Sequence, residues 1–208
     1  MTVLERIVLA SASPRRLELL RSLGFEVTVA PSGYHEPPMP HLAPRDLAIS
    51  HAREKLASVA RVGGAATVAA DTVVDLDGEA LGKPRDAAEA ARMLEALSGR
   101  EHLVHTAYAV ALPGIEAPLE AAETTRVRFH DLSAEEIAEY VATGEPMDKA
   151  GAYGIQGRAA ALVAGIDGDF YTVMGFPLGG FVRSLRKSGF VPPRLMARFE
   201  TEVGENVV

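Results

Sequence analysis

An abrupt change from a short apolar segment to a helix start constrains the fold of this chain more than any other feature. Residues 7–10 (IVLA) have the pattern of a buried strand, and Ser13 and Pro14 then stand where the N-cap and the first residue of a helix belong. Leucines at helical spacing follow, and Gly24 is the expected end of this helix. A strand that leads directly into a helix favours an α/β fold.

The first turn of this helix carries two arginines, Arg15 and Arg16. Cationic side chains oppose the helix dipole at this end, where free backbone N–H groups and a partial positive charge favour an anion. An anionic ligand would remove the conflict, and phosphate is favoured because guanidinium binds its oxygens through two parallel hydrogen bonds. We interpret the segment as a phosphate site. The alternative is a pair of solvated arginines on an ordinary capped helix.

Strand-like and helix-like segments alternate along the rest of the chain. Strand patterns occur at residues 25–30, 67–74, 103–112, 120–129 and 160–166, and helical patterns at 44–62, 86–97, 134–143 and 178–187. A proline-rich loop is predicted over residues 31–44, and a hairpin turn at Asp77–Gly78. With neither an internal repeat nor a linker, this mixture favours one α/β fold with a mixed sheet bent into two lobes.

Composition excludes several classes of function. The formal net charge of −7 argues against a broad nucleic-acid surface, and the absence of cysteine excludes disulfides, thiolate metal sites and a cysteine nucleophile. The chain shows no signal-peptide pattern and no apolar run that could span a bilayer, so we expect a cytoplasmic protein without a membrane partner. The six histidines show no ligand-like spacing with acids, and we expect most of them at the surface.

Two more charged residues stand in unusual surroundings. Asp71 lies inside the apolar segment 67–74, where a buried carboxylate is unfavourable unless a partner or ligand uses it. We expect Asp71 near a strand end that faces a cleft, as a metal ligand or general base; a structural acid that caps a helix or turn is the alternative. Lys83, in the sequence GKP, is placed either to contact a ligand or to lie in solvent.

A glycine-rich segment at residues 143–157 is the third chemical signal. The glycines after Lys149 allow the backbone to approach a ligand closely and to adopt positive φ. Gln156 has an amide that can both donate to and accept from the edge of a nucleotide base. An ordinary surface loop is the alternative, but apolar neighbours such as Ile155 indicate a packed loop instead.

Together these segments resemble the Maf family of nucleoside triphosphate pyrophosphatases, the septum-formation-inhibitor-like proteins. The matching motifs, in the family's order, are LASASPRRLELL at 9–20, HAREKLA at 51–57, AADTVV at 69–74, GKPRD at 82–86, GEPMDKAGAYGIQG at 144–157 and VMGFPL at 173–178. The resemblance implies a single domain over residues 1–208, with an elongated mixed α/β sheet flanked by helices and a cleft between two lobes. The DKAG form of the late motif is similar to the branch that hydrolyses dTTP and UTP.

The resemblance also implies roles for individual residues. Asp71 matches the catalytic proton acceptor, and Glu36 lies where the family has an acid that helps to hold a divalent metal. Around Glu36, however, the chain departs from the commoner pattern. Positions linked to substrate choice are Arg15, Thr72 and Gln156, and polar phosphate-binding positions are Ser11, Ser13, Arg16, Lys55 and Lys83.

These residue types suit hydrolysis of an α–β phosphoanhydride bond, which releases a nucleoside monophosphate and pyrophosphate. Mg²⁺ or Mn²⁺ on oxygen ligands from Glu36 and Asp71 would polarise the phosphoryl group and a water molecule. Asp71 could then accept the proton of the attacking water. Gln156 is predicted to recognise the imide edge of a pyrimidine. Cations that would neutralise the triphosphate are Arg15, Arg16, Lys55 and Lys83.

Two other functions compete with this interpretation. A non-catalytic nucleotide-binding regulator of cell division would bind nucleotide without releasing pyrophosphate. A nucleotidyltransferase or phosphotransferase would need a second substrate, and the chain has neither a P-loop nor a protein-kinase signature. Every expected catalytic position is filled, which favours the hydrolase. The resemblance also implies a homodimer as one candidate assembly.

Overall fold

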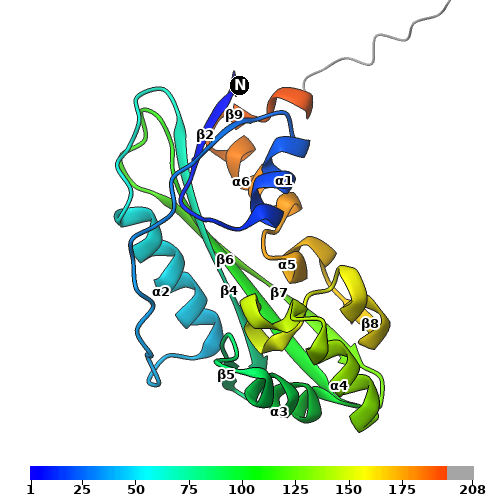
Figure 1. Ribbon diagram of the computed structural model, residues 1–208. Helices are drawn as coiled ribbons and strands as arrows, with labels where there is room; N and C mark the ends of the chain where they lie inside the picture. Colours follow the sequence, from blue (N-terminus) through cyan, green and yellow to red (C-terminus); the bar gives the residue numbers. More distant parts are fainter. Residues whose placement is uncertain (196–208) are drawn as a thin grey trace, which may run out of the picture.

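Three eleven-residue strands form the centre of the main sheet (Figure 1). These are β4 (Ala66–Leu76), β6 (Glu101–Ala111) and β7 (Leu119–Phe129), and they pair antiparallel in that order. At about 3.3 Å per residue each strand is about 36 Å long, which is enough to carry a separate group of helices at each end. The structure is a computed structural model, and it describes residues 1–195.

Four shorter strands complete the main sheet, whose order is β3-β2-β4-β6-β7-β8, with β5 attached to β4. The strands β2 (Arg6–Leu9) and β3 (Glu26–Val29) are parallel to each other, and β2 is parallel to the start of β4. The strand β5 (Glu79–Leu81) pairs antiparallel with β4, and β8 (Val163–Asp167) pairs antiparallel with β7. The predicted mixed sheet is therefore confirmed.

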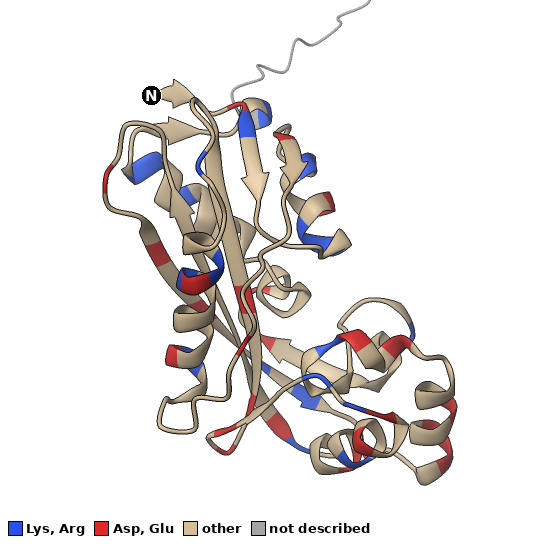
Figure 2. Cartoon of the chain, turned by 60° about the vertical axis from the view of Figure 1, so that its left-hand side comes forward, with Lys and Arg blue, Asp and Glu red and all other residues tan. Residues whose placement is uncertain are grey.

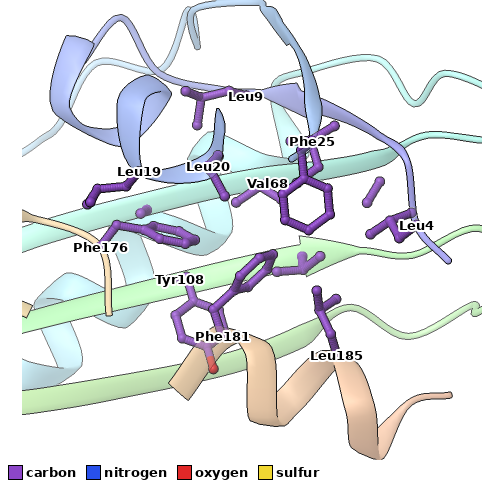
Figure 3. Close-up of a cluster of buried hydrophobic side chains, with 14 of the residues drawn as sticks. Leu4, Leu9, Leu19, Leu20, Phe25, Val68, Tyr108, Phe176, Phe181 and Leu185 are labelled. Carbon is purple, nitrogen blue, oxygen red and sulfur yellow. The ribbon is translucent and has the colours of Figure 1, made fainter. Parts of the chain in front are cut away.

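The first lobe packs around β2, β3 and one end of the long strands. Its helices are α1 (Pro14–Ser22), the short α5 (Phe170–Met174) and α6 (Leu178–Lys187), and a small parallel pair joins β1 (Thr2–Val3) to β9 (Phe190–Val191). Leu9, Leu20 and Phe181 are fully buried there, and the Phe176 and Phe181 ring centroids lie 5.1 Å apart (Figure 3). Each such side chain contributes roughly 1.5–3 kcal/mol through burial.

The second lobe lies at the other end of the long strands (Figure 2). It contains α3 (Ala87–Leu97), α4 (Ala134–Ala142) and three 3₁₀ turns, at Glu145–Asp148, Ala150–Ala152 and Gly157–Leu162. The helix starts agree with their sequence signals: Asp86 caps α3, and Ser133 with Glu136 forms a complete capping box on α4. The expected two-lobed α/β architecture is thus confirmed.

Helix α2 (Pro44–Ala57) covers the opposite face of the long strands from α1 and α6 (Figure 1). Its buried alanines, Ala48 and Ala52, pack against a surface that is itself made of small residues, such as Ala69 and Ala107. Small side chains on both sides allow the helix to approach the sheet closely. No helix within residues 1–195 is long and apolar enough to cross a membrane.

Three details differ from the sequence predictions. The helix expected over residues 44–62 ends at Ala57, where the Ser58 hydroxyl bonds the Lys55 carbonyl oxygen at 2.8 Å. The strand expected over 160–166 is a 3₁₀ turn up to Leu162 and a strand only from Val163, because an apolar run does not by itself distinguish the two. The histidines are not mostly exposed: His51, His102 and His105 are buried.

His102 is buried among aromatic rings. Its Nε2 atom lies 2.6 Å from the Tyr153 hydroxyl, and its ring packs edge-on against Phe129 and Tyr153 at 5.2 and 5.4 Å. Within residues 1–195 its Nδ1 atom is buried without a hydrogen-bond partner. Burial lowers the pKa of His102 from 6.5 to about 4.

This histidine predicts a specific loss of stability in acid. Between pH 6.5 and 4 the unfolded chain binds a proton at His102 that the folded chain excludes, so the free energy of unfolding falls as the pH drops. A shift of this size corresponds to about 3 kcal/mol. Urea unfolding at pH 7 to 4 should show this extra loss in the wild type and in the exposed control His130→Asn, but not in His102→Asn. If the free energy of unfolding fell equally with pH in all three proteins, this role of His102 would be contradicted.

Candidate active site

The cleft opens where one edge of β4 has no neighbouring strand. Along this edge β2 pairs with residues 66–68 and β5 with residues 74–76, and no other described strand pairs with the stretch between them. A cleft of about 1210 Å³ borders this open stretch. The β2–α1 turn, the proline-rich loop, α2 and the glycine-rich segment also line it. Side chains of both lobes therefore reach one cavity.

An ion-pair cluster occupies the α2 side of this edge. The Lys55 ammonium donates to Asp71 Oδ1 at 2.6 Å and lies 2.6 Å from Glu36 Oε1. The side chains of Lys55 and Asp71 are only 11% and 8% exposed. Asp71 is in the middle of β4 and not near a strand end, so the expected position was wrong. The strand edge is open there because its neighbours are short, and this is how a mid-strand carboxylate reaches the cleft.

The proline-rich loop is tied to α2 at several points, and these hold Glu36 in place. The Tyr34 hydroxyl lies 3.2 Å from His51 Nδ1, and the hydroxyls of Ser32 and Ser58 are 2.8 Å apart. Partial burial acts to raise the pKa of Glu36. The hydrogen bond and charge of Lys55, with smaller effects of other cations, outweigh it and hold that pKa below its usual value. Glu36 is therefore a carboxylate at neutral pH.

The β2–α1 turn builds the opposite wall. Ser13 caps α1 as predicted, accepting from the Arg16 backbone N–H at 3.5 Å, and the Ser11 hydroxyl accepts from the Ser13 N–H at 3.2 Å. The Arg16 side chain turns inward: it donates to the Gly175 carbonyl at 2.8 Å and to the hydroxyls of Ser11 and Thr72 at 3.2 Å each. Burial lowers the pKa of Arg16, and the nearby charge of Asp71 opposes this effect.

Arg15 and Lys83 line the cleft like Arg16, but unlike Arg16 they make no side-chain hydrogen bond or ion pair within residues 1–195. Arg15 is half-buried, whereas Lys83 is exposed at the end of β5. The Gly151 N–H bonds the Gly82 carbonyl at 3.0 Å, which attaches the Lys83 segment to the glycine-rich segment. All the residues singled out from the sequence line this one cleft: Ser11, Ser13, Arg15, Arg16, Glu36, Lys55, Asp71, Thr72, Lys83 and Gln156.

The glycine-rich segment is a packed loop, as its apolar residues indicated. Gly151 has φ +65°, and a Cβ there would lie 3.0 Å from the Val74 side chain. A Cβ on Gly154 would lie 2.9 Å from the Lys149 side chain, whose ammonium bonds the Glu145 carbonyl at 2.6 Å. Lys149 thus folds back onto its own loop. These contacts place the exposed Gln156 at the rim of the cleft.

Two buried threonines behind the cleft were not identified from the sequence. The Thr106 hydroxyl, on β6, lies 2.9 Å from the Thr72 hydroxyl and donates to the Thr172 carbonyl at 2.7 Å. Both Thr106 and Thr172 are completely buried. Thr106 could have been noticed as a polar residue directly before the run AYAVA (107–111) of β6, but buried threonines are common in strands and its partners are remote in sequence.

The donor set of the cleft suits a divalent cation bound together with a ligand. Glu36 and Asp71 direct one oxygen each to the same point, where the Lys55 ammonium lies. Within residues 1–195 no group of three or more acids and histidines gathers around a common position. Two carboxylates match Mg²⁺, which is usually held by one or two carboxylates and completes its shell with phosphate oxygens and water.

Comparison with known proteins identifies the family. A family model described as Maf-like protein matches residues 6–188. The chain belongs to the Maf family. It is 53% identical over 185 residues to the dTTP/UTP pyrophosphatase of Geobacter sulfurreducens, covering 88% of this chain and 97% of the relative. It is 48% identical over 186 residues to the dTTP/UTP pyrophosphatase of Thermus thermophilus, covering 89% and 96%.

The resemblance to the Maf family inferred from the motifs is therefore confirmed. Among solved structures, a HAM1 protein from Coxiella burnetii matches 88% of this chain and all of its own length, with 19% identity and a TM-score of 0.47.

The Lys55 cluster predicts unequal effects of removing two cations from α2. Lys55→Met leaves Asp71 without its buried partner and should lower the free energy of unfolding by about 3 kcal/mol. Arg53→Met, which breaks the exposed pair of Arg53 with Glu120, should lower it by less than about 1 kcal/mol. Combining Lys55→Met with Asp71→Asn should restore part of the loss. Urea unfolding of the wild type and these three variants measures the differences, and equal losses at Lys55 and Arg53 would contradict the prediction.

Proposed function

We propose that this chain hydrolyses dTTP and UTP to the nucleoside monophosphate and pyrophosphate. The observation that carries the proposal is the Asp71–Lys55–Glu36 cluster at the open edge of β4, facing further cations across one cleft. The substrates are taken from the names of the relatives that share about half of their residues with this chain. The DKAG segment at 148–151 agrees with that choice.

Recognition of the triphosphate falls to the cleft's cations. Arg15 and Lys83 are open to the cleft and can bind the β- and γ-phosphates, where a guanidinium offers two parallel donors and an ammonium a point charge. Lys55 can reach the α-phosphate from beside Asp71. Arg16 already uses three of its N–H groups within the protein, so we assign it mainly to holding Ser11 and Thr72 in position.

Asp71 is assigned the role of proton acceptor. Within residues 1–195 its side chain is hydrogen-bonded only through Oδ1, to Lys55, which leaves Oδ2 for a water molecule in the cleft. The water attacks the α-phosphorus, Asp71 takes its proton, and the bond to the bridging oxygen breaks as pyrophosphate leaves. Arg15 and Lys83 stabilise the charge that develops on the leaving group.

Glu36 and Asp71 would hold a divalent cation in this cleft. Mg²⁺ or Mn²⁺ bound there would polarise the phosphoryl group and lower the pKa of a bound water molecule. Lys55 would then release one or both carboxylates, and its ammonium would remain available for phosphate. This is consistent with a cleft in which a lysine ammonium balances the charge of the two carboxylates.

The base is assigned to the opposite face of the same strand edge. Successive residues of a strand point to opposite faces, so Thr72 lies on the α1 side while Asp71 lies on the α2 side. A ligand whose α-phosphate reaches Asp71 across the open edge would place its uncharged end near Thr72. Apolar groups of Val173, Met174 and Ile155 line the cleft there, which suits a pyrimidine ring.

The proposed activity is tested by pyrophosphate release from a panel of nucleoside triphosphates, with Mg²⁺, with Mn²⁺ and with a chelator. We expect metal-dependent release from dTTP and UTP, with weaker release from CTP and purine nucleotides. Release from other nucleotides alone would keep the reaction and reject the substrate assignment. Binding of nucleotide without release from any of them would support the non-catalytic regulator instead.

The role of Asp71 predicts a large effect of a minimal substitution. Asp71→Asn keeps the shape of the side chain but removes the proton acceptor, so kcat should fall by about two to four powers of ten while nucleotide still binds. Asp75→Asn is the matched control, because Asp75 lies on the same face of the same strand and is outside the cleft lining. Its kcat should stay within about threefold of the wild type. Near-normal turnover in a folded Asp71→Asn protein would remove Asp71 from the mechanism.

A further inference from the structure

A directed chain of hydrogen bonds runs behind the Thr72 side of the cleft. It begins at Arg16 Nη2, which donates to Thr72 Oγ1 at 3.2 Å, and continues to Thr106 Oγ1 at 2.9 Å. It ends at the carbonyl oxygen of Thr172, 2.7 Å from Thr106 Oγ1. The chain links α1, β4, β6 and α5, and its inner members Thr106 and Thr172 are completely buried, so solvent does not compete with the bond between them.

The two ends of this chain determine the direction of every bond in it. A hydroxyl has one proton to donate and two lone pairs to accept with. The Thr172 carbonyl can only accept, so the single proton of Thr106 is used there, and Thr106 must accept from Thr72. The proton of Thr72 is therefore directed inward. At the other end Arg16 can only donate, so it occupies one lone pair of Thr72.

What Thr72 offers to the cleft is therefore one free lone pair and no proton. An acceptor at this position matches the N3–H of uracil or thymine, which is a donor. It does not match the N3 atom of cytosine, which is an acceptor, and two facing acceptors repel each other. The same hydroxyl would accommodate both bases if its proton were free to rotate.

We propose that Thr106 is a specificity-determining positioning residue, which makes Thr72 an obligate acceptor and so selects uracil and thymine over cytosine. This inference rests on the proposed function for the placement of the base near Thr72. Thr106 is completely buried and does not contact a ligand; it acts by fixing the proton of its neighbour. The class of substrate it selects is pyrimidine nucleotides with a protonated N3.

The test compares the binding of α,β-methylene-UTP and α,β-methylene-CTP, which are not cleaved at the scissile bond, by calorimetry. The wild type should prefer the uridine analogue. Thr106→Val keeps the shape of the side chain but removes its hydroxyl. The preference for the uridine analogue should therefore fall about tenfold, which corresponds to the free energy of one hydrogen bond. The Thr172 carbonyl keeps the Gly175 N–H as a partner at 3.1 Å, which favours folding of this variant. Thr106→Ala serves as a second version of the same change.

Two controls separate fixation of the proton from a general effect of substitution. Thr106→Ser retains the hydroxyl and should keep the wild-type preference within about twofold. Thr125→Val removes another fully buried threonine hydroxyl, which donates to the Asp169 carbonyl at 2.9 Å and has no contact with Thr72. This variant should also keep the wild-type preference for the uridine analogue. A preference that is absent in the wild type, or unchanged in Thr106→Val and Thr106→Ala, would overturn the proposal.

Pyrophosphate release from UTP and CTP is measured on the same proteins, so that failure of the two proposals can be told apart. If the wild type releases no pyrophosphate but Thr106→Val still loses the preference in binding, the proposed hydrolase activity fails and the role of Thr106 stands. If release from UTP is normal and the binding preference is insensitive to Thr106, the role of Thr106 fails and the proposed activity stands.

Discussion

The middle of strand β4 lines the cleft, and its uneven pairing governs which side chains reach the cleft from this strand. Its neighbours on one side, β2 and β5, are too short to cover residues 69–73, and the open stretch lies between the two lobes. Because side chains alternate along a strand, this stretch presents Asp71 to the α2 face and Thr72 to the α1 face. A single exposed edge therefore presents the charged region of Asp71, Lys55 and Glu36 on one face and the Thr72 hydroxyl, which Arg16 bonds, on the other. In the proposed function the first face meets the α-phosphate and the second face meets the base.

Burial of charge explains why the charged region is built as it is. A buried ion pair contributes little net stability, because the loss of hydration offsets most of the attraction, and an apolar pair of similar size is often as stable. The cluster of Lys55 with Asp71 and Glu36 is therefore poorly explained as a stabilising device. It is better explained by its place in the cleft, where a phosphate or a divalent cation can take over the partners of each charge. Lys55 pairs with both carboxylates and holds them in position at the cleft.

Sequence signals predicted those features that depend on neighbours in the chain. Ser13 and Ser133 cap their helices as predicted, since an N-cap bonds groups two or three residues away. Features that depend on remote partners were missed or misplaced. The burial of His102 depends on Tyr153, and the open edge around Asp71 depends on the lengths of β2 and β5. The structure places the motif residues around one cleft. The motifs did not distinguish Arg16, whose side chain is hydrogen-bonded within the protein, from Arg15, which makes no side-chain hydrogen bond within residues 1–195.

The chain of hydrogen bonds behind Thr72 shows why motif residues are an incomplete account of specificity. A threonine hydroxyl is chemically ambiguous, because it can present either a proton or a lone pair to a ligand. Only its inner neighbours remove the ambiguity, and here the decisive group is a backbone carbonyl, that of Thr172, reached through Thr106. No pattern of residue types encodes the direction of that carbonyl. A relative with the same Thr72 but an apolar residue in place of Thr106 would have the same contact residues and a less selective cleft.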